Sequence, residues 1–118
     1  MERESVSRDE YVRKLLDAYR TTPGTTGHIR RPDRLLAAQL HQRGVPLRVV
    51  ENALVLAVAR RLMHSPEAPP PGTIRSLAYL VPVIEEVLEG TVGQEYFNYL
   101  RYRLASHFPN MGKTPAAR

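Results

Sequence analysis

The chain contains no cysteine, which excludes a disulfide framework, a thiolate nucleophile and a cysteine-ligated zinc site. Only two of its seventeen basic residues are lysines, and the other fifteen are arginines. No apolar run approaches the roughly 18 residues of a membrane span, and the first residues are charged. We therefore expect a cytoplasmic protein with no secretory leader and no membrane partner.

Strand patterns are almost absent, whereas apolar residues recur at helical spacing in five segments. The length of 118 residues and the ordinary apolar content are those of one domain. We predict an all-α protein in which residues 1–118 form a single domain, a compact bundle of about five helices. Residues 66–72 are expected to form a proline-rich linker, and residues 109–118 a flexible tail.

The predicted helices cover residues 8–20, 32–43, 46–63, 73–90 and 94–108. Ser7 and Glu10 have the spacing of a capping box at the start of the first helix, and Gly44 ends the second. The third helix is apolar on almost every side, which is typical of a helix buried at the centre of a bundle. Pro82 falls inside the fourth helix, where it is expected to remove one backbone hydrogen bond and bend the axis.

Positive charge is concentrated in residues 20–61. This stretch holds eight arginines against Asp33 and Glu51, a net charge of +6, whereas the charges of residues 62–118 balance. Such a one-sided basic stretch is typical of proteins that bind nucleic acid. A codon usage that favours arginine would raise the arginine content too, so the composition alone does not decide the function.

Residues 35–63 have the pattern of a helix-turn-helix with its turn at Gly44. In that motif the second helix enters the major groove of DNA. Here it offers Arg48 and Asn52, followed by Arg60 and Arg61 near its end. The same pattern also describes two helices of an ordinary core, and the apolar surface of the second helix favours that alternative.

Arg30, Arg31 and Arg34, with His41 farther along the same helix face, form another candidate contact with nucleic acid. They lie at the start of a predicted helix, where backbone N–H groups and the helix dipole favour a phosphate. The threonine- and glycine-rich loop over residues 21–27 could wrap a nucleic-acid backbone. The alternative is a solvated helix face beside a flexible loop.

Tyr99, Tyr102 and Arg103 share one side of the fifth predicted helix, opposite its apolar side. Aromatic rings interleaved with arginine can stack on unpaired bases. They can also anchor a protein interface. A third interpretation is that the two tyrosines pack under the first helix or under the linker.

The sequence shows no constellation of catalytic or metal-binding residues. Its four histidines are scattered without metal-ligand spacing, and Gly24 and Gly27 lack the Lys-Ser/Thr that a P-loop requires. Glu85, Glu86 and Glu89 are interpreted as a solvated helix face rather than a magnesium site. We therefore predict that the protein is not an enzyme and has no catalytic residue, metal or cofactor.

One segment resembles a known family. It reads Ile-Arg-Ser-Leu-Ala-Tyr-Leu over residues 74–80, followed by Val83, Ile84 and Glu85. This resembles the closing motif of the helical domains in DnaD-type replisome organisers and plasmid replication proteins. The resemblance implies a helical DNA-remodelling or replication-loading module that binds DNA with its last helix and tail. By position, the implied contacts are Arg101, Arg103 and Lys113.

The sequence thus predicts a non-catalytic nucleic-acid-binding protein, with DNA preferred to RNA, that serves replication, transposition or transcription. One alternative is a small helical subunit of a larger nucleoprotein complex, whose basic face meets nucleic acid only after assembly with protein partners. The other is a protein-interaction adaptor whose arginines are compositional.

Overall fold

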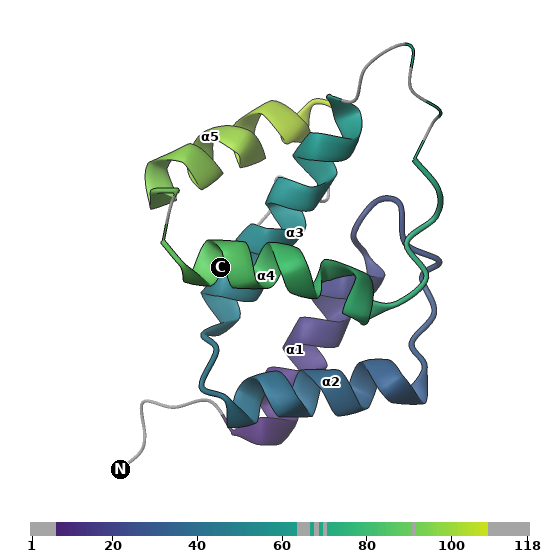
Figure 1. The fold of residues 1–118 in the computed structure, drawn as a ribbon, viewed down its shortest axis with the longest axis vertical. Coiled ribbons are helices and arrows are strands. Elements are labelled where there is room, and N and C mark those ends of the chain that lie inside the picture. Colours follow the sequence, from purple (N-terminus) through teal and green to yellow (C-terminus); the bar gives the residue numbers. More distant parts are fainter. Residues whose placement is uncertain (1–6, 64–66, 68, 70, 91, 109–118) are drawn as a thin grey trace.

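A computed structural model describes residues 7–63, 67, 69, 71–90 and 92–108 (Figure 1). These residues form five α-helices and one short 3-10 helix, η1: α1 (Arg8–Arg20), α2 (Arg31–Gln42), α3 (Leu47–Leu62), η1 (Leu77–Leu80), α4 (Val81–Leu88) and α5 (Gln94–Ala105). The predicted all-α bundle of about five helices is confirmed. The predicted tail at 109–118 lies outside the described residues, as does part of the predicted proline-rich linker at 66–72.

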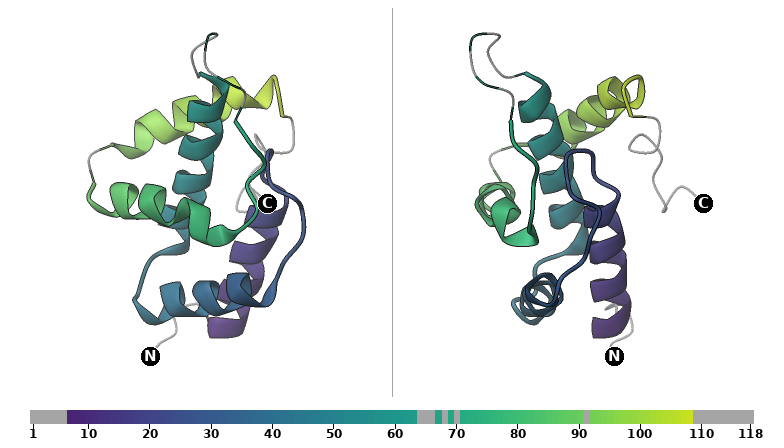
Figure 2. Two further views of the ribbon diagram at one scale, coloured as in Figure 1. Left: turned by 45° about the vertical axis from the view of Figure 1, so that its right-hand side comes forward. Right: turned by 90° about the vertical axis from the view of Figure 1, so that its right-hand side faces the viewer.

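The central element is α3. In Figure 1, α4 crosses α3, α5 lies at one end of the long axis, and α2 lies at the other end. The turned views in Figure 2 keep α5 and α2 at opposite ends. Every residue of α3 from position 52 to position 59 is buried, and the apolar surface of the predicted helix indicated this for all of them except Asn52. None of the helices within the described ranges has the length and apolar character needed to cross a membrane.

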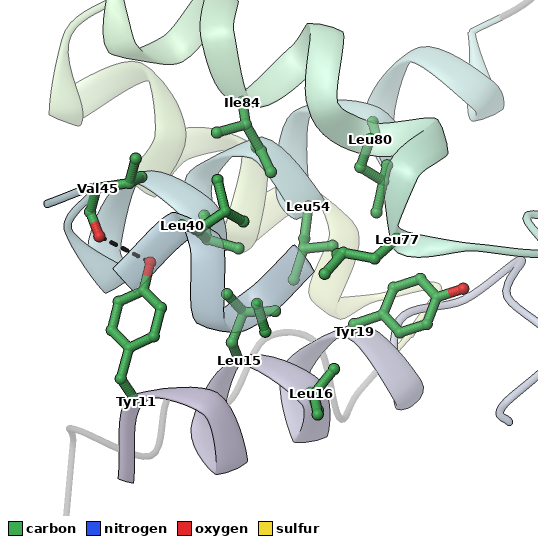
Figure 3. Close-up of a cluster of buried hydrophobic side chains, with 14 of the residues drawn as sticks. Tyr11, Leu15, Leu16, Tyr19, Leu40, Val45, Leu54, Leu77, Leu80 and Ile84 are labelled. Carbon is green, nitrogen blue, oxygen red and sulfur yellow. Dashed lines mark hydrogen bonds between the residues drawn. The ribbon is translucent and has the colours of Figure 1, made fainter. Parts of the chain in front are cut away.

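The bundle buries two groups of apolar side chains. The larger group joins α1, α2, one side of α3, η1 and α4, and Figure 3 shows 14 of its residues. The smaller group joins the second half of α3 to α5 and consists of Val55, Leu56, Val58, Ala59, Phe97, Leu100 and Leu104. Because α5 packs mainly on the smaller group, its position depends on few side chains.

The start of α1 follows the predicted cap in part. The Ser7 hydroxyl accepts the backbone N–H of Glu10 at 3.2 Å, and α1 covers the predicted residues 8–20. The Glu10 carboxylate forms an ion pair with Lys14 (3.0 Å), one helical turn farther on. The capping interaction that the structure records is therefore the one from the serine.

The segment that precedes Pro82 differs from the prediction. Residues 73–76 are not helical, because the backbone of Ile74 pairs with the loop after α1: its N–H donates to Gly24 (2.7 Å) and its carbonyl accepts from Thr26 (3.1 Å). The predicted helix over 73–90 is therefore η1 followed by α4. Pro82 lies in the first turn of α4, where its missing N–H leaves no intrahelical bond unmade, so it starts the helix instead of bending it.

Tyr11 links α1 to the turn after α2, since its buried hydroxyl donates to the carbonyl of Val45 at 2.7 Å (Figure 3). Burial raises the pKa of Tyr11 from its ordinary value of 10.0 to about 12. The neutral phenol is therefore favoured in the folded state, and its contribution to stability is full below pH 10 and is lost as the pH rises towards about 12.

We expect Tyr11→Phe to lower the free energy of unfolding by about 1 kcal/mol at pH 7, because one buried hydrogen bond is lost. The same variant should lose less stability than the wild type between pH 10 and pH 12. Urea denaturation at pH 7, 10 and 12 measures both effects. An equal loss of stability in the two proteins across this interval would contradict the assignment.

Candidate nucleic-acid interface

The first turn of α2 is held by a buried carboxylate. Asp33 is 2% exposed, and its two oxygens accept the backbone N–H of Arg30 and the backbone N–H of Leu77, each at 2.9 Å. The bond to Arg30 caps the helix from inside, and the bond to Leu77 ties α2 to the start of η1. Asp33 therefore fixes the backbone from which the neighbouring arginines project.

This cap changes the chemistry expected at the start of α2. The N–H of Arg30 is occupied by Asp33, Pro32 has no N–H, and the N–H groups of Asp33 and Arg34 bond to the Arg30 carbonyl. A phosphate would therefore meet guanidinium groups here rather than a row of unpaired backbone donors. This differs from the helix-terminus contact that the sequence indicated.

The side chains of Arg30, Arg31 and Arg34 project from this turn, and all three residues are exposed. Across the described residues, no carboxylate forms an ion pair with any of these three arginines. Their guanidinium groups keep their donors for a ligand, and each can bind a phosphate through two parallel hydrogen bonds. We call these three residues the α2 arginine cluster.

A groove of about 600 Å³ lies between α1 and α2, and Arg34 forms part of its wall. On the side of α1 the groove is lined by three further arginines and two aspartates: Arg8, Arg13, Arg20, Asp9 and Asp17. Asp17 pairs with Arg20 at 2.8 Å. The arginines of α1 thus join Arg34 around one groove. Arg8 and Arg13 were not among the contacts predicted from the sequence, because only the packing of α1 on α2 places them beside α2.

Arg43 and Arg60, also in the basic stretch, point to acidic partners on α4. Arg43 bonds Glu85 through two nitrogens (3.0 and 3.3 Å), and Arg60 bonds Glu86 likewise (2.8 and 2.5 Å). These hydrogen bonds raise the pKa of both arginines, and the bond from Arg60 lowers the pKa of Glu86. Of the predicted contacts, Arg60 is therefore engaged within the fold, and Glu85 and Glu86 are ion-pair partners rather than a purely solvated face.

Arg61 also contacts other segments of the fold. It donates to the carbonyl of Gly72, and its guanidinium lies beside Gly24, where a Cβ atom would come within 3.2 Å of its Nε. Gly24 has a positive φ of 95°, so the turn and the close approach both require glycine. Arg61 therefore supports the loop between α1 and α2, and a role in ligand contact would compete with this one.

The threonine-rich loop is itself held in place. The hydroxyl of Thr22 donates to the carbonyl of Ala18 (2.6 Å), and that of Thr25 donates to the carbonyl of Thr22 (3.0 Å). Together with the two backbone bonds to Ile74, these contacts fix the loop against the segment before η1. The hydroxyl hydrogens of Thr22 and Thr25 are therefore engaged within the fold and are not available to a ligand.

The helix-turn-helix interpretation assigned Arg48 and Asn52 to base contacts. Arg48 is exposed, but Asn52 is 4% exposed and its amide donates to the side chain of Gln94 at 3.0 Å. Asn52 is therefore a link between α3 and α5, and we leave it out of the candidate surface. Because residues 52–59 are all buried, α3 presents no long face to a major groove.

His41 does not extend the α2 arginine cluster. It is half-buried in the last turn of α2, and its ring lies edge-on to that of Tyr11, with centroids 5.0 Å apart and planes at 64°. Ten residues of helix separate it from Arg31, a rise of about 15 Å. This contact gives His41 a packing role between α1 and α2.

The tyrosines of α5 lie on the surface. Tyr99 and Tyr102 are exposed, and Arg103 donates to the Tyr99 hydroxyl at 2.8 Å. The alternative that these tyrosines pack under α1 or under the linker is wrong, because both are exposed and the buried side of α5 is formed by Phe97, Leu100 and Leu104.

Arg101, which the resemblance implied, is half-buried beside α3. Burial lowers its pKa, the charge of Glu51 raises it, and the charge of Arg48 lowers it again. The other implied contacts are Arg103, which is exposed on α5, and Lys113, which lies outside the described residues.

The described residues hold no group of three histidine, aspartate or glutamate side chains that could bind a metal ion. No family model, curated protein or solved structure matches this chain.

Proposed function

We propose that this protein binds nucleic acid without catalysing a reaction, and that the α2 arginine cluster contacts the phosphate backbone. The observation that supports this most is the exposure of Arg30, Arg31 and Arg34 without an ion-pair partner among the described side chains. Three guanidinium groups within two helical turns would otherwise repel one another, and a phosphate strand removes that repulsion. The proposal includes DNA as the preferred nucleic acid and the cytoplasm as the location.

The arginines of the groove extend this contact surface. Arg8 and Arg13 line the same groove as Arg34, so a backbone that reaches the α2 arginine cluster can continue along α1. Asp9 and Asp17 line it as well, and they reduce the positive potential on that side. A contact of this kind reads the backbone and not the bases, which suits an accessory factor in replication, transposition or transcription.

A second candidate function is that of a subunit in a larger nucleoprotein complex. It is favoured by the apolar floor of the groove, where Leu35 is exposed beside Ile29 and Val12. A phosphate backbone does not cover such a floor, whereas a protein segment does. In that case the isolated chain would bind nucleic acid weakly.

The proposed function predicts binding that weakens steeply with salt. Fluorescence anisotropy with labelled duplex DNA, single-stranded DNA and RNA over 25 to 300 mM salt, about the range in which counterion release is measured, would report it. The variant Arg31→Gln/Arg34→Gln should reduce the slope of log K against log salt by about two. Its affinity at about 0.1 M salt should fall on the order of tenfold to 100-fold.

The matched control is Arg43→Gln/Arg60→Gln, which removes the same charge from arginines that already pair with glutamates. These pairs are exposed, so the control should remain folded. Its slope should stay close to that of the wild type. Equal effects of the two double variants would show that only net charge matters. No binding to any of the three ligands at the lowest salt would refute the proposed function for the isolated chain.

A further inference from the structure

Three tyrosines form an exposed row along α5. Tyr96, Tyr99 and Tyr102 are 43%, 49% and 78% exposed, and their spacing of three residues sets them along one side of the helix. The opposite side of α5 packs on α3. We call these residues the tyrosine row. Their exposure needs an explanation, because large aromatic side chains usually gain from burial.

The rings of the row are positioned by contacts within it. The rings of Tyr96 and Tyr99 have centroids 6.4 Å apart and planes inclined by 33°. The guanidinium of Arg103 lies 5.8 Å from the centre of the Tyr99 ring and also donates to the Tyr99 hydroxyl. Such a cation–π contact holds both groups and leaves the outer ring of Tyr102 free. Tyr96 and Tyr99 are therefore pre-arranged, so a flat ligand pays little to order this part of the row.

The composition of the exposed side of α5 favours a nucleic-acid partner over a protein partner. The exposed residues of α5 are Glu95, Tyr96, Asn98, Tyr99, Tyr102 and Arg103, and none of them is aliphatic. Protein interfaces also favour tyrosine and arginine, but their centre is depleted of other charged residues, whereas this side carries Glu95 and no aliphatic residue. Rings with polar edges beside an arginine have instead the composition of surfaces that stack bases.

One positive charge lies within the row. The Arg103 guanidinium is beside the Tyr99 ring, and Glu95 lies on the same helix. Arg101 is half-buried on another side of α5, where Glu51 and Arg48 influence its pKa. A phosphate that follows the stacked bases can therefore pair with Arg103.

The row also ends at a hollow. Tyr96 lines a depression of about 470 Å³ between α3 and the start of α5, together with Leu56, Ala59, Met63 and Val92. Its walls are largely apolar, and Arg60, held by Glu86, stands at its edge. The Tyr96 ring therefore lies beside α3, and Tyr99 and Tyr102 form the open part of the row.

From these observations we infer that the tyrosine row of α5 is a stacking surface for the unpaired bases of single-stranded nucleic acid. The faces of bases are hidden in a duplex, so the row can act only on single strands or unpaired ends. This inference rests on the proposed function, but it uses another part of the molecule. The helix α2, from whose first turn the α2 arginine cluster projects, and α5 lie at opposite ends of the bundle (Figures 1 and 2).

The test compares Tyr99→Leu/Tyr102→Leu with Tyr99→Phe/Tyr102→Phe. Leucine keeps an apolar side chain without a ring, whereas phenylalanine keeps the ring without the hydroxyl. Anisotropy is measured at one salt concentration with a labelled 15-nucleotide oligo-thymidine and with a duplex of equal length. We expect the leucine variant to bind the single strand about 10- to 100-fold more weakly, with the phenylalanine variant within about threefold of the wild type. Duplex affinity should be equal in all three proteins.

Photocrosslinking gives a direct readout. An oligonucleotide that carries 5-iodouracil should crosslink to Tyr99 or Tyr102, as mapped by mass spectrometry of the digested adduct. Circular dichroism checks that the variants are folded, and because both side chains are exposed, we expect no change.

Several outcomes would overturn the inference. Unchanged single-strand affinity of the leucine variant would refute it while leaving the proposed function intact. An equal loss in the leucine and phenylalanine variants would assign the effect to the hydroxyls and not to stacking. A self-associated wild type that becomes monomeric in the leucine variant, as judged by light scattering, with no change in single-strand affinity, would assign the row to a protein contact. Failure of the wild type to bind either oligonucleotide would remove both proposals together.

Discussion

Replacing Asp33 with alanine is expected to lower the free energy of unfolding by about 3 kcal/mol. Its buried carboxylate accepts two backbone N–H groups, those of Arg30 and Leu77. Hydrogen bonds to a charged group contribute roughly 1.5 to 3 kcal/mol each, and their loss leaves two donors without a partner. Alanine also removes the carboxylate from the first turn of α2, where the helix dipole favours a negative charge.

The matched control for this prediction is Asp33→Asn, which has nearly the same shape and keeps one oxygen that can accept a backbone N–H. It should lose about half as much stability as the alanine variant. Urea denaturation followed by circular dichroism at pH 7 measures both. A loss below about 1 kcal/mol in Asp33→Ala would mean that the carboxylate does not hold α2 to η1.

Phe97→Ala is the second substitution with a large expected effect. Phe97 is almost fully buried and is the largest side chain in the apolar group that joins α5 to the second half of α3. Deleting a buried phenylalanine ring costs about 3 to 5 kcal/mol, since the apolar contacts are lost and a cavity remains. This is a large part of the 5 to 15 kcal/mol that stabilises a typical domain.

Because Phe97 lies between α5 and α3, its replacement should destabilise α5 more than the rest of the fold. The larger apolar group, with α1 and α2, does not include Phe97, so hydrogen exchange in Phe97→Ala should accelerate first in α5. Phe97→Leu, which keeps most of the volume, should lose less than about 1.5 kcal/mol. Uniform acceleration of exchange over α1 and α5 would show that the two groups of apolar residues unfold as one unit.

Features that depend only on neighbouring residues, such as helix ends and an apolar helix surface, were predicted correctly. The helix over residues 8–20 begins at a serine cap, and the helix after Pro46 is apolar on nearly every side, so its burial follows from its composition. Gly44 follows α2 with a positive φ of 78°, as expected for a residue that ends a helix. These predictions depend on neighbours in the chain and require no knowledge of the tertiary contacts.

The prediction of one helix over residues 73–90 was wrong because the structure of this segment depends on a tertiary contact. The threonine at position 73 and the apolar residues that follow it are compatible with a helix from there onwards. The pairing of Ile74 with the loop around Gly24 holds this segment extended instead. A contact across fifty residues outweighed the local preference, and Pro82 became the start of a helix as a result.

The distribution of charge was also predicted only in part: the sequence gives the number of arginines, and the tertiary structure gives their partners. Composition placed an excess of arginine in residues 20–61, but only the tertiary structure distinguishes the arginines that have partners from those that do not. Arg43 and Arg60 meet Glu85 and Glu86 because α4 packs on α3 and near the end of α2. Net charge is a sum over the chain, whereas availability to a ligand depends on pairwise distances, which the sequence does not contain.

The sequence by itself determined the helical class, the central place of α3 and the apolar and aromatic sides of α5, because each follows from periodicity along a single helix. The tertiary structure decided that Asn52 is a buried link to Gln94, that the arginines of α1 share a groove with Arg34, and that the tyrosine row is left uncovered. Each of these depends on which helices pack together. Helix packing is a property of whole surfaces, and one helix read alone does not specify its neighbour.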